Sequence, residues 1–167
     1  MRKKPTKFIG IKTLLVLTFL FQTFQLKSQS VEKPEVFIFG ETIDNILQKI
    51  KPLCTSTEYR ENEPIQLPTA QKMQSQLDCE GFMYAGKPRK VELIFADEIL
   101  DMVWILTEES EEQQFIEKFK EMYGEPSHIV EDATFFLSHG LAVRNKPHEV
   151  LFISERLKKP YEQFLNQ

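Results

Sequence analysis

The segment Lys90–Leu106 (KVELIFADEILDMVWIL) constrains the fold more than any other part of the chain. It contains two apolar runs, residues 91–96 and 100–106, separated by the acidic pair Asp97-Glu98. Both runs show the two-residue alternation of β-strands and are rich in β-branched and aromatic residues. The pattern predicts two antiparallel strands joined by a tight turn. Because the second run is apolar on both faces, we expect it near the centre of a sheet, with a helix covering one face.

The first thirty residues have the composition of a signal peptide. Basic residues near the N-terminus precede an apolar stretch at Thr13–Phe24, which is too short to cross a bilayer comfortably. Ser28 and Ser30 provide small residues at a cleavage site before Val31. An uncleaved membrane anchor is the alternative interpretation. We expect export to the periplasm or the medium, removal of residues 1–30, and no stable membrane insertion afterwards.

The remaining chain, residues 31–167, has a length that suits a single domain with its own core. Six of the 21 Lys and Arg residues lie in the first thirty positions, where there is no Asp or Glu, so the charge after residue 30 is 15 − 25 = −10. Binding to nucleic acid needs a basic surface. The composition therefore argues against a nucleic-acid partner, and solubility explains the acidity.

Exactly two cysteines, Cys54 and Cys79, are present. In an exported chain an even number favours a disulfide bond. The alternatives are two buried thiols or one reactive thiol, but neither cysteine belongs to a C-x-x-C motif, which argues against redox catalysis. The bridge would tie down the polar segment 54–74, in which Pro64 and Pro68 disfavour regular structure.

This polar segment provides the candidate binding residues Tyr59, Arg60, Ile65 and Leu67. A long irregular segment inside a compact domain is usually functional or disordered, and a disulfide would order it. A solvated connection with a few anchoring apolar residues is the simpler alternative. Trp104 would be a further contact candidate if it were exposed, but its position within a strand indicates the core.

The other elements follow from periodicity and capping signals. Apolar residues at helical spacing predict a helix over 43–50, and Ser110–Gln113 is a capping box before a second helix that ends at Gly124. Residues 36–39 form an edge strand or cover the core. The remaining expected elements are strands at 76–84, 133–138, 141–144 and 149–154 and a short helix within 155–167 that Pro160 interrupts or starts.

The predicted fold class is α+β, with an antiparallel sheet of about five to seven strands and two helices packed on one face. The order of a helix, three strands, a second helix and three further strands suggests two αβββ units. Gly40–Leu106 would form the first unit and Ser110–Ser154 the second.

Three short segments carry a resemblance: FGETIDNI at the first helix, VELIFADEILDMVWI in the hairpin, and YGEP at the end of the second helix. In these segments the chain resembles exported αβ modules of the β-lactamase-inhibitor-like and small outer-membrane-assembly lipoprotein type. The resemblance covers about half of the chain after residue 30. It implies a protein-binding module and carries no catalytic residues across. The lipid-attachment cysteine of the lipoproteins is absent after the apolar stretch, so no membrane anchor is implied.

No motif nominates a catalytic residue, a metal ligand or a cofactor. The histidines His128, His139 and His148 are widely spaced, and no H-E-x-x-H, G-x-S-x-G or glycine-rich phosphate loop occurs. We expect a non-enzymatic exported protein that binds another protein or a component of the cell envelope. The alternatives are an exported hydrolase or metal-dependent enzyme that uses these histidines, and a carrier of a small apolar ligand.

Overall fold

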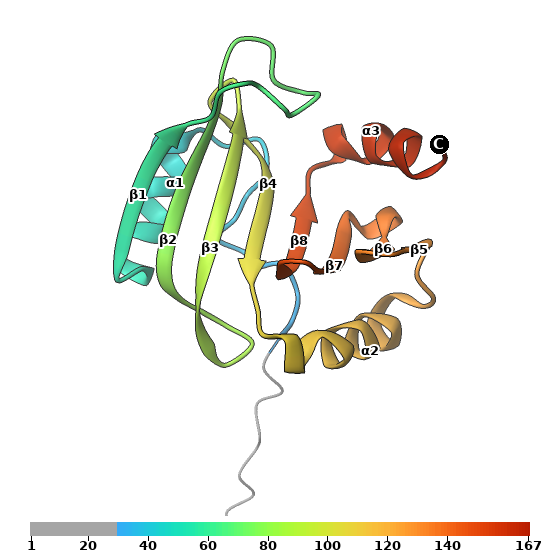
Figure 1. The fold of residues 1–167 in the computed structure, drawn as a ribbon. Coiled ribbons are helices and arrows are strands. Elements are labelled where there is room, and N and C mark those ends of the chain that lie inside the picture. Colours follow the sequence, from blue (N-terminus) through green and yellow to red (C-terminus); the bar gives the residue numbers. More distant parts are fainter. Residues whose placement is uncertain (1–29) are drawn as a thin grey trace, which may run out of the picture.

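Eight antiparallel strands form one open sheet in the computed structural model, which describes residues 30–167 (Figure 1). The predicted signal peptide lies outside the described residues, apart from Ser30. The strands are β1 (Ser56–Glu61), β2 (Gln74–Tyr84), β3 (Lys87–Ala96), β4 (Ile99–Leu106), β5 (His128–Val130), β6 (Ala133–Phe136), β7 (Leu141–Asn145) and β8 (His148–Ile153). Across the sheet they lie in the order β1-β2-β3-β4-β8-β7-β6-β5. Two four-stranded meanders therefore meet edge to edge at the antiparallel β4–β8 pair.

The predicted central hairpin is confirmed as β3 and β4, which lie third and fourth in the sheet. Its turn consists of Asp97 and Glu98, which both have positive φ angles, 50° and 69°. The two strands alternate as expected. Residues of one face of β3 and β4 are completely buried, namely Val91, Leu93, Phe95, Val103 and Ile105. The other face of β4 carries Met102, Trp104 and Leu106.

Two helices, α1 (Ile43–Ile50) and α2 (Glu112–Tyr123), cover what we call the first face of the sheet. Thr42 caps α1 through its side chain, and the predicted apolar stripe buries Ile46 and Ile50. Phe115 and Phe119 of α2 stack on one another and complete this core. The segment 36–39 forms turns, and its Phe37 is buried in the same core, so it covers the core and is not an edge strand.

The third helix, α3 (Glu155–Leu165), packs on the opposite side, the second face. Leu157 anchors it among apolar residues of β4, β6 and β8. Pro160 lies inside α3 and does not interrupt it. The second face is also covered by the loop between β1 and β2, which contributes Leu67 to the same cluster.

The predicted α+β class and the antiparallel sheet are confirmed, but the predicted number of strands is too low, and the predicted two-helix packing leaves out α3, the short helix expected within 155–167. The two missed strands, β1 and β5, are the edges of the sheet. Most residues of both strands are exposed, so their sequences lack the alternation of apolar and polar residues that indicates a half-buried strand. As a result each meander contains four strands, where the sequence suggested three. α3 also lies on the face opposite to the other two helices.

Two local predictions also need correction. The residue that closes the capping box before α2 is Glu111, whose carboxylate accepts a hydrogen bond from the backbone N–H of Glu108 (3.1 Å). A carboxylate can serve this role as well as a hydroxyl does, so the helix signal begins two residues before Ser110. The segment 54–74 is only partly irregular, because pairing with β2 orders its first part as β1.

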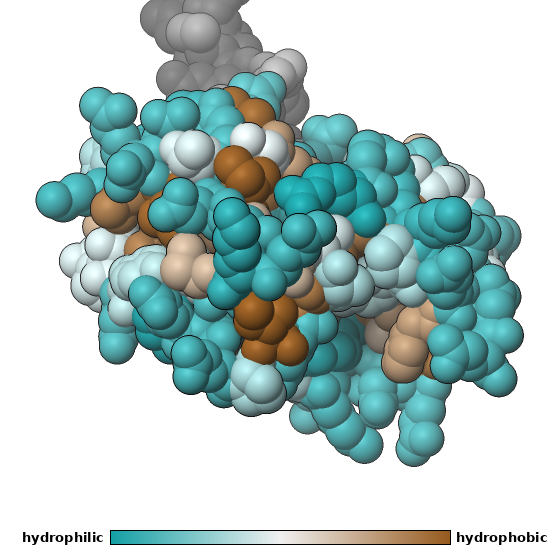
Figure 2. Space-filling model, turned by 90° about the horizontal axis from the view of Figure 1, so that it is seen from above, coloured by the Kyte–Doolittle hydropathy of each residue, from teal (hydrophilic) through white to brown (hydrophobic). Residues whose placement is uncertain are grey.

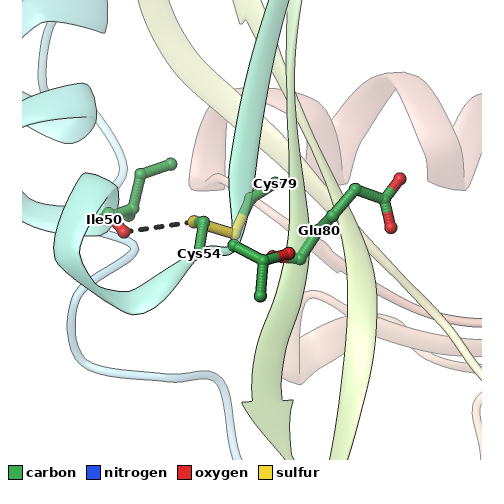
Figure 3. The surroundings of a disulfide bond; sticks show 5 residues. Ile50, Cys54, Cys79 and Glu80 are labelled. Atoms are coloured by element: carbon green, nitrogen blue, oxygen red, sulfur yellow. Dashed lines mark hydrogen bonds between the residues drawn. A yellow bond between two sulfur atoms is a disulfide. The ribbon is translucent and has the colours of Figure 1, made fainter.

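The predicted disulfide bond between Cys54 and Cys79 is confirmed (Figure 3). Cys54 follows the single 3₁₀ turn after α1, and Cys79 lies in β2 on the first face. The bond therefore ties the end of α1 to the sheet. Gly81 follows in β2 with a φ of 76°, where the pairing of β2 with β3 shifts register at a bulge. A Cβ added here would also lie 2.7 Å from the Cγ2 atom of the Thr55 side chain, so that side chain would have to move.

Candidate functional site

The second face carries an open groove with a volume of about 790 Å³. Its floor is formed by β2, β3, β4, β7 and β8, and its two walls are α3 and the loop 62–73. Figure 1 shows this loop leaning across the ends of β3 and β4 toward α3. Seen from the end that carries the loop and α3, the surface is mostly hydrophilic with separate apolar patches (Figure 2).

The floor of the groove has an apolar strip made by neighbouring strands. Ile94 of β3 lies directly opposite Met102 of β4, and Trp104 and Leu106 continue the strip along β4. These residues share one face because side chains alternate along a strand. Trp104 is half-buried, which leaves part of its ring available to a molecule in the groove.

A cationic side chain lies over this tryptophan. The Arg144 guanidinium of β7 is 4.5 Å from the centroid of the Trp104 ring, a cation–π contact. Arg144 also forms an ion pair with the carboxylate of Glu149, which lies opposite it on β8. Burial raises the pKa of Glu149 to about 7, even though the Arg144 charge opposes this effect. The arrangement holds the arginine and the tryptophan in fixed positions on the groove floor.

Glu92 of the floor belongs to a second charged network, whose other members lie on the same face of the sheet but do not line the groove. Lys90 bridges the carboxylates of Asp78 (3.0 Å) and Glu92 (2.8 Å). Arg60 pairs with the same Asp78 at 2.6 Å. Hydrogen bonds from Gln76, Arg60 and Lys90 keep the pKa of Asp78 below its usual range, although its burial acts in the opposite direction. Each charge in this network therefore has an opposite charge beside it.

The loop wall is held in place by two side chains from the sheet. The Gln74 Oε1 atom accepts hydrogen bonds from the backbone N–H groups of Gln66 and Leu67, both at 2.8 Å. The Asp97 carboxylate accepts from three consecutive backbone N–H groups, those of residues 71–73. These backbone hydrogen bonds lower the pKa of Asp97. The loop is thus ordered by hydrogen bonds, in spite of its irregular backbone.

The helix wall is fixed at its N-terminal end. The Ser154 hydroxyl donates to Asp101 at 2.6 Å, a contact that is buried. Arg156 donates to the backbone oxygen of Thr69 at 3.1 Å and so connects α3 to the loop wall. Further along α3, Tyr161 packs 6.1 Å from the ring of Phe135. The last aromatic residue of α3, Phe164, is 69% exposed at the edge of the groove.

The four binding residues predicted from the sequence do not form one surface. Leu67 is buried and lines the groove. Arg60 points to the same face because it lies opposite Gln76, whereas Tyr59 lies opposite Leu77 and points to the first face. Ile65 is exposed on the loop. The structure therefore connects Leu67 and Arg60 with the groove face and separates Tyr59 from it.

The histidines of the enzyme hypothesis are not brought together. His139 precedes β7 and stacks on Tyr123 at 4.3 Å, whereas His148 follows β7 and lies 3.3 Å from a carboxylate oxygen of Glu112. The two histidines are therefore at opposite ends of β7 and have different partners. His128 lies on the edge strand β5. Within residues 30–167, no group of three His, Cys, Asp or Glu side chains could hold a metal ion.

Sequence reasoning missed most of the groove residues. Trp104 was assigned to the core, and Arg144, Glu149, Tyr161 and Phe164 were not singled out. One signal was available: Arg144 and Glu149 are charged residues at the ends of otherwise apolar strands. Their convergence on Trp104 depends on the β4–β8–β7 order, which local periodicity does not contain.

Comparisons with protein-family models, with curated proteins and with solved structures find no match to this chain. The fold and the site define an α+β protein with an eight-stranded antiparallel sheet and a groove on one face. None of the helices within residues 30–167 is long and apolar enough to cross a membrane.

Proposed function

We propose that this protein is an exported, non-catalytic binding protein and that it holds its ligand, a protein segment or a component of the cell envelope, in the groove. The observation that carries the proposal is the groove itself: about 790 Å³ between two walls that hydrogen bonds hold in place. Binding sites of this size are common, and a site that is already formed loses less entropy on binding.

The chemistry of the lining favours binding over catalysis. The groove is lined by none of the three histidines and by no serine or cysteine. Its two carboxylates, Glu92 and Glu149, are paired with Lys90 and Arg144. A general acid or base needs a carboxyl oxygen that is not already paired and that lies within hydrogen-bond reach of the substrate. Ion pairs of this kind fit a structural role and the orientation of a ligand.

One observation favours a hydrolase as the second candidate. Glu149 has a pKa raised to about 7, and Glu92 contributes to this rise through its charge. Two carboxyl groups in one groove, one of them with a raised pKa, are the components of acid–base hydrolysis. The ion pair with Arg144 opposes this role, because it stabilises the ionised form of Glu149, whereas a general acid must be protonated.

A carrier of a small apolar ligand fits the groove less well. Of the residues that line it, nearly half are polar, and three of them are charged. An apolar ligand would leave these groups without hydrogen-bond partners, which costs free energy. The groove also opens to the surface, whereas apolar ligands are usually enclosed.

The proposal is tested by comparing two variants that each remove an exposed apolar side chain. Phe164→Ala changes the groove edge, and Met83→Ala changes an equally exposed residue of β2 that does not line the groove. Purified protein from cells that express the full chain is immobilised and incubated with envelope extract. We expect a ligand that is retained by the wild type and by Met83→Ala and is reduced about tenfold with Phe164→Ala. Equal retention by both variants would place the site elsewhere.

Tyr59→Ala tests the alternative site on β1, since Tyr59 is exposed on the first face. Loss of the ligand with this variant, and not with Phe164→Ala, would contradict the groove proposal. Turnover of the retained ligand into a smaller product, abolished in Glu149→Gln, would identify the hydrolase in place of the binding protein.

A further inference from the structure

The charged residues at the groove are neutralised within the protein. Arg144 pairs with Glu149, and Lys90 pairs with Glu92. A ligand that carried its own net charge would have to separate one of these pairs or bury its charge without a partner, and both cost free energy. The lining therefore fits a ligand without net charge.

Apart from the hydroxyl of Tyr161, the remaining polar groups of the lining are all side-chain amides. Six side chains of this type face the groove: Asn62, Gln66, Gln74, Gln76, Gln163 and Gln167. An amide side chain has both donors and acceptors. Within residues 30–167, the side chains of Gln66 and Gln163 make no hydrogen bond, and Gln74 uses only its oxygen. These groups can pair with hydroxyls, which also donate and accept.

The floor strands have no free sheet edge with which an extended peptide could form backbone hydrogen bonds. Each floor strand has a hydrogen-bonded neighbour on both sides, in the order β1-β2-β3-β4-β8-β7-β6. A peptide that adds to a sheet needs a free edge, because backbone hydrogen bonds supply most of its affinity. A peptide in this groove would depend on side-chain contacts alone, so the floor favours a ligand that binds through hydroxyl groups.

Three aromatic residues line the groove, Trp104, Tyr161 and Phe164. Trp104 lies on the floor, and Phe164 stands at the edge of the helix wall. Sugar rings are amphipathic: their C–H faces pack on aromatic rings, and their edges carry hydroxyls. The groove has both kinds of partner, since the apolar strip of β4 lies between the amides of β2 and those of α3.

We infer that the ligand of the groove is a neutral oligosaccharide. This inference rests on the proposed function, because it names the ligand class of the same groove. The contact between Arg144 and Trp104 would fix the indole ring, and the amides of both walls would hydrogen-bond the hydroxyls of successive sugar residues. The Glu92 carboxylate has two acceptor oxygens and the Arg144 guanidinium has five N–H donors, so both can bind neighbouring hydroxyls while they remain paired.

The experiment uses an array of neutral linear oligosaccharides of one to six residues (gluco-, xylo-, manno- and N-acetylglucosamine series), their uronic-acid counterparts, and an array of extended peptides. We expect retention of at least one neutral series, with affinity that rises from one to several residues. Because the ligand has no net charge, affinity should change less than about twofold between 0.05 and 0.5 M salt. Retention of the acidic sugars alone, or of no sugar, would overturn the inference.

Point variants test whether the oligosaccharide binds in the groove. Phe164→Ala should weaken the affinity for the retained oligosaccharide about tenfold, and Gln163→Ala should weaken it less. The exposed control Met83→Ala should leave the affinity unchanged. Equal affinities for Phe164→Ala and the wild type would overturn the inference even if a sugar binds.

The peptide array separates failure of the inference from failure of the proposed function. If peptides bind, no sugar does, and Phe164→Ala reduces peptide binding, the groove is a binding site and only the ligand class is wrong. If neither array shows binding that depends on Phe164, the inference fails together with the proposed function.

Discussion

The ion pair between Arg89 and Glu111 predicts a specific dependence of stability on pH. The two side chains form a bidentate contact, with N–O distances of 2.7 and 2.8 Å, that joins β3 to the turn before α2. The Arg89 side chain is 4% exposed and that of Glu111 is 13% exposed. Hydrogen bonds, first those from Arg89 and then those from Lys87 and the Glu108 backbone N–H, lower the pKa of Glu111 from 4.5 to about 2, although burial acts in the opposite direction.

Because the pKa is lower in the folded state, the stabilisation is present above pH 4.5 and is lost as the pH falls toward 2. The difference between the two pKa values corresponds to at most about 3 kcal/mol. Screening by solvent around a surface ion pair reduces this to about 1–2 kcal/mol. Glu111→Gln should therefore lower the free energy of unfolding at pH 7, and the difference from the wild type should shrink by about 1–2 kcal/mol near pH 2.5.

Urea unfolding between pH 7 and pH 2.5 measures this difference directly. The control is Glu109→Gln, an exposed carboxylate two residues away that has no ion pair in the described part of the chain. Its difference from the wild type should stay constant over the same pH range. A constant difference for Glu111→Gln as well would refute the assignment of the ion pair as the cause.

Three further changes have expected outcomes. Replacing both Cys54 and Cys79 by serine should lower the free energy of unfolding by about 3.5 kcal/mol, since the bond closes a loop with a sequence separation of 25; an unchanged urea midpoint would contradict this. Burial raises the pKa of Glu149 to about 7, so the wild type should lose at most about 3 kcal/mol of stability as the pH rises from 4.5 to 7. Glu149→Gln should abolish that slope in thermal melts, and a retained slope would assign it to another group. Gly140→Ala should destabilise the protein by more than about 1 kcal/mol, because the residue has a φ of 61° and a Cβ would lie 2.6 Å from the Ile153 carbonyl oxygen; a thermal midpoint equal to that of the wild type would contradict this.

The central hairpin could be predicted because its information is local. The alternation in 91–96 and 100–106 reports burial on a pleated strand, and the disulfide followed from the number of cysteines and the expected compartment. The edge strands β1 and β5 could not be found in this way. They are ordered by pairing with β2 and β6. Most of their side chains are exposed, so their sequences do not alternate between buried and exposed residues.

The groove could not be predicted from local sequence patterns, because contacts between separate parts of the chain form it. Arg144 and Glu149 face each other across the local β7–β8 hairpin, but they reach Trp104 of β4 only through the contact between the two meanders. The walls depend on single long-range contacts, such as Arg156 with Thr69 and Gln74 with the loop backbone. Leu67 was predicted as a binding residue from loop composition, and it does line the groove. Its partners there are set by tertiary structure.

The most direct test of the groove as a binding site is the fluorescence of Trp104. It is the only tryptophan of the chain, it is half-buried, and it lies on the groove floor. Titration with a ligand retained in the array experiment should change its emission with a saturation curve that matches the affinity measured by calorimetry, and Phe164→Ala should shift that curve to higher concentration. Calorimetric binding of the ligand without any change in Trp104 emission would show that the ligand binds outside the groove.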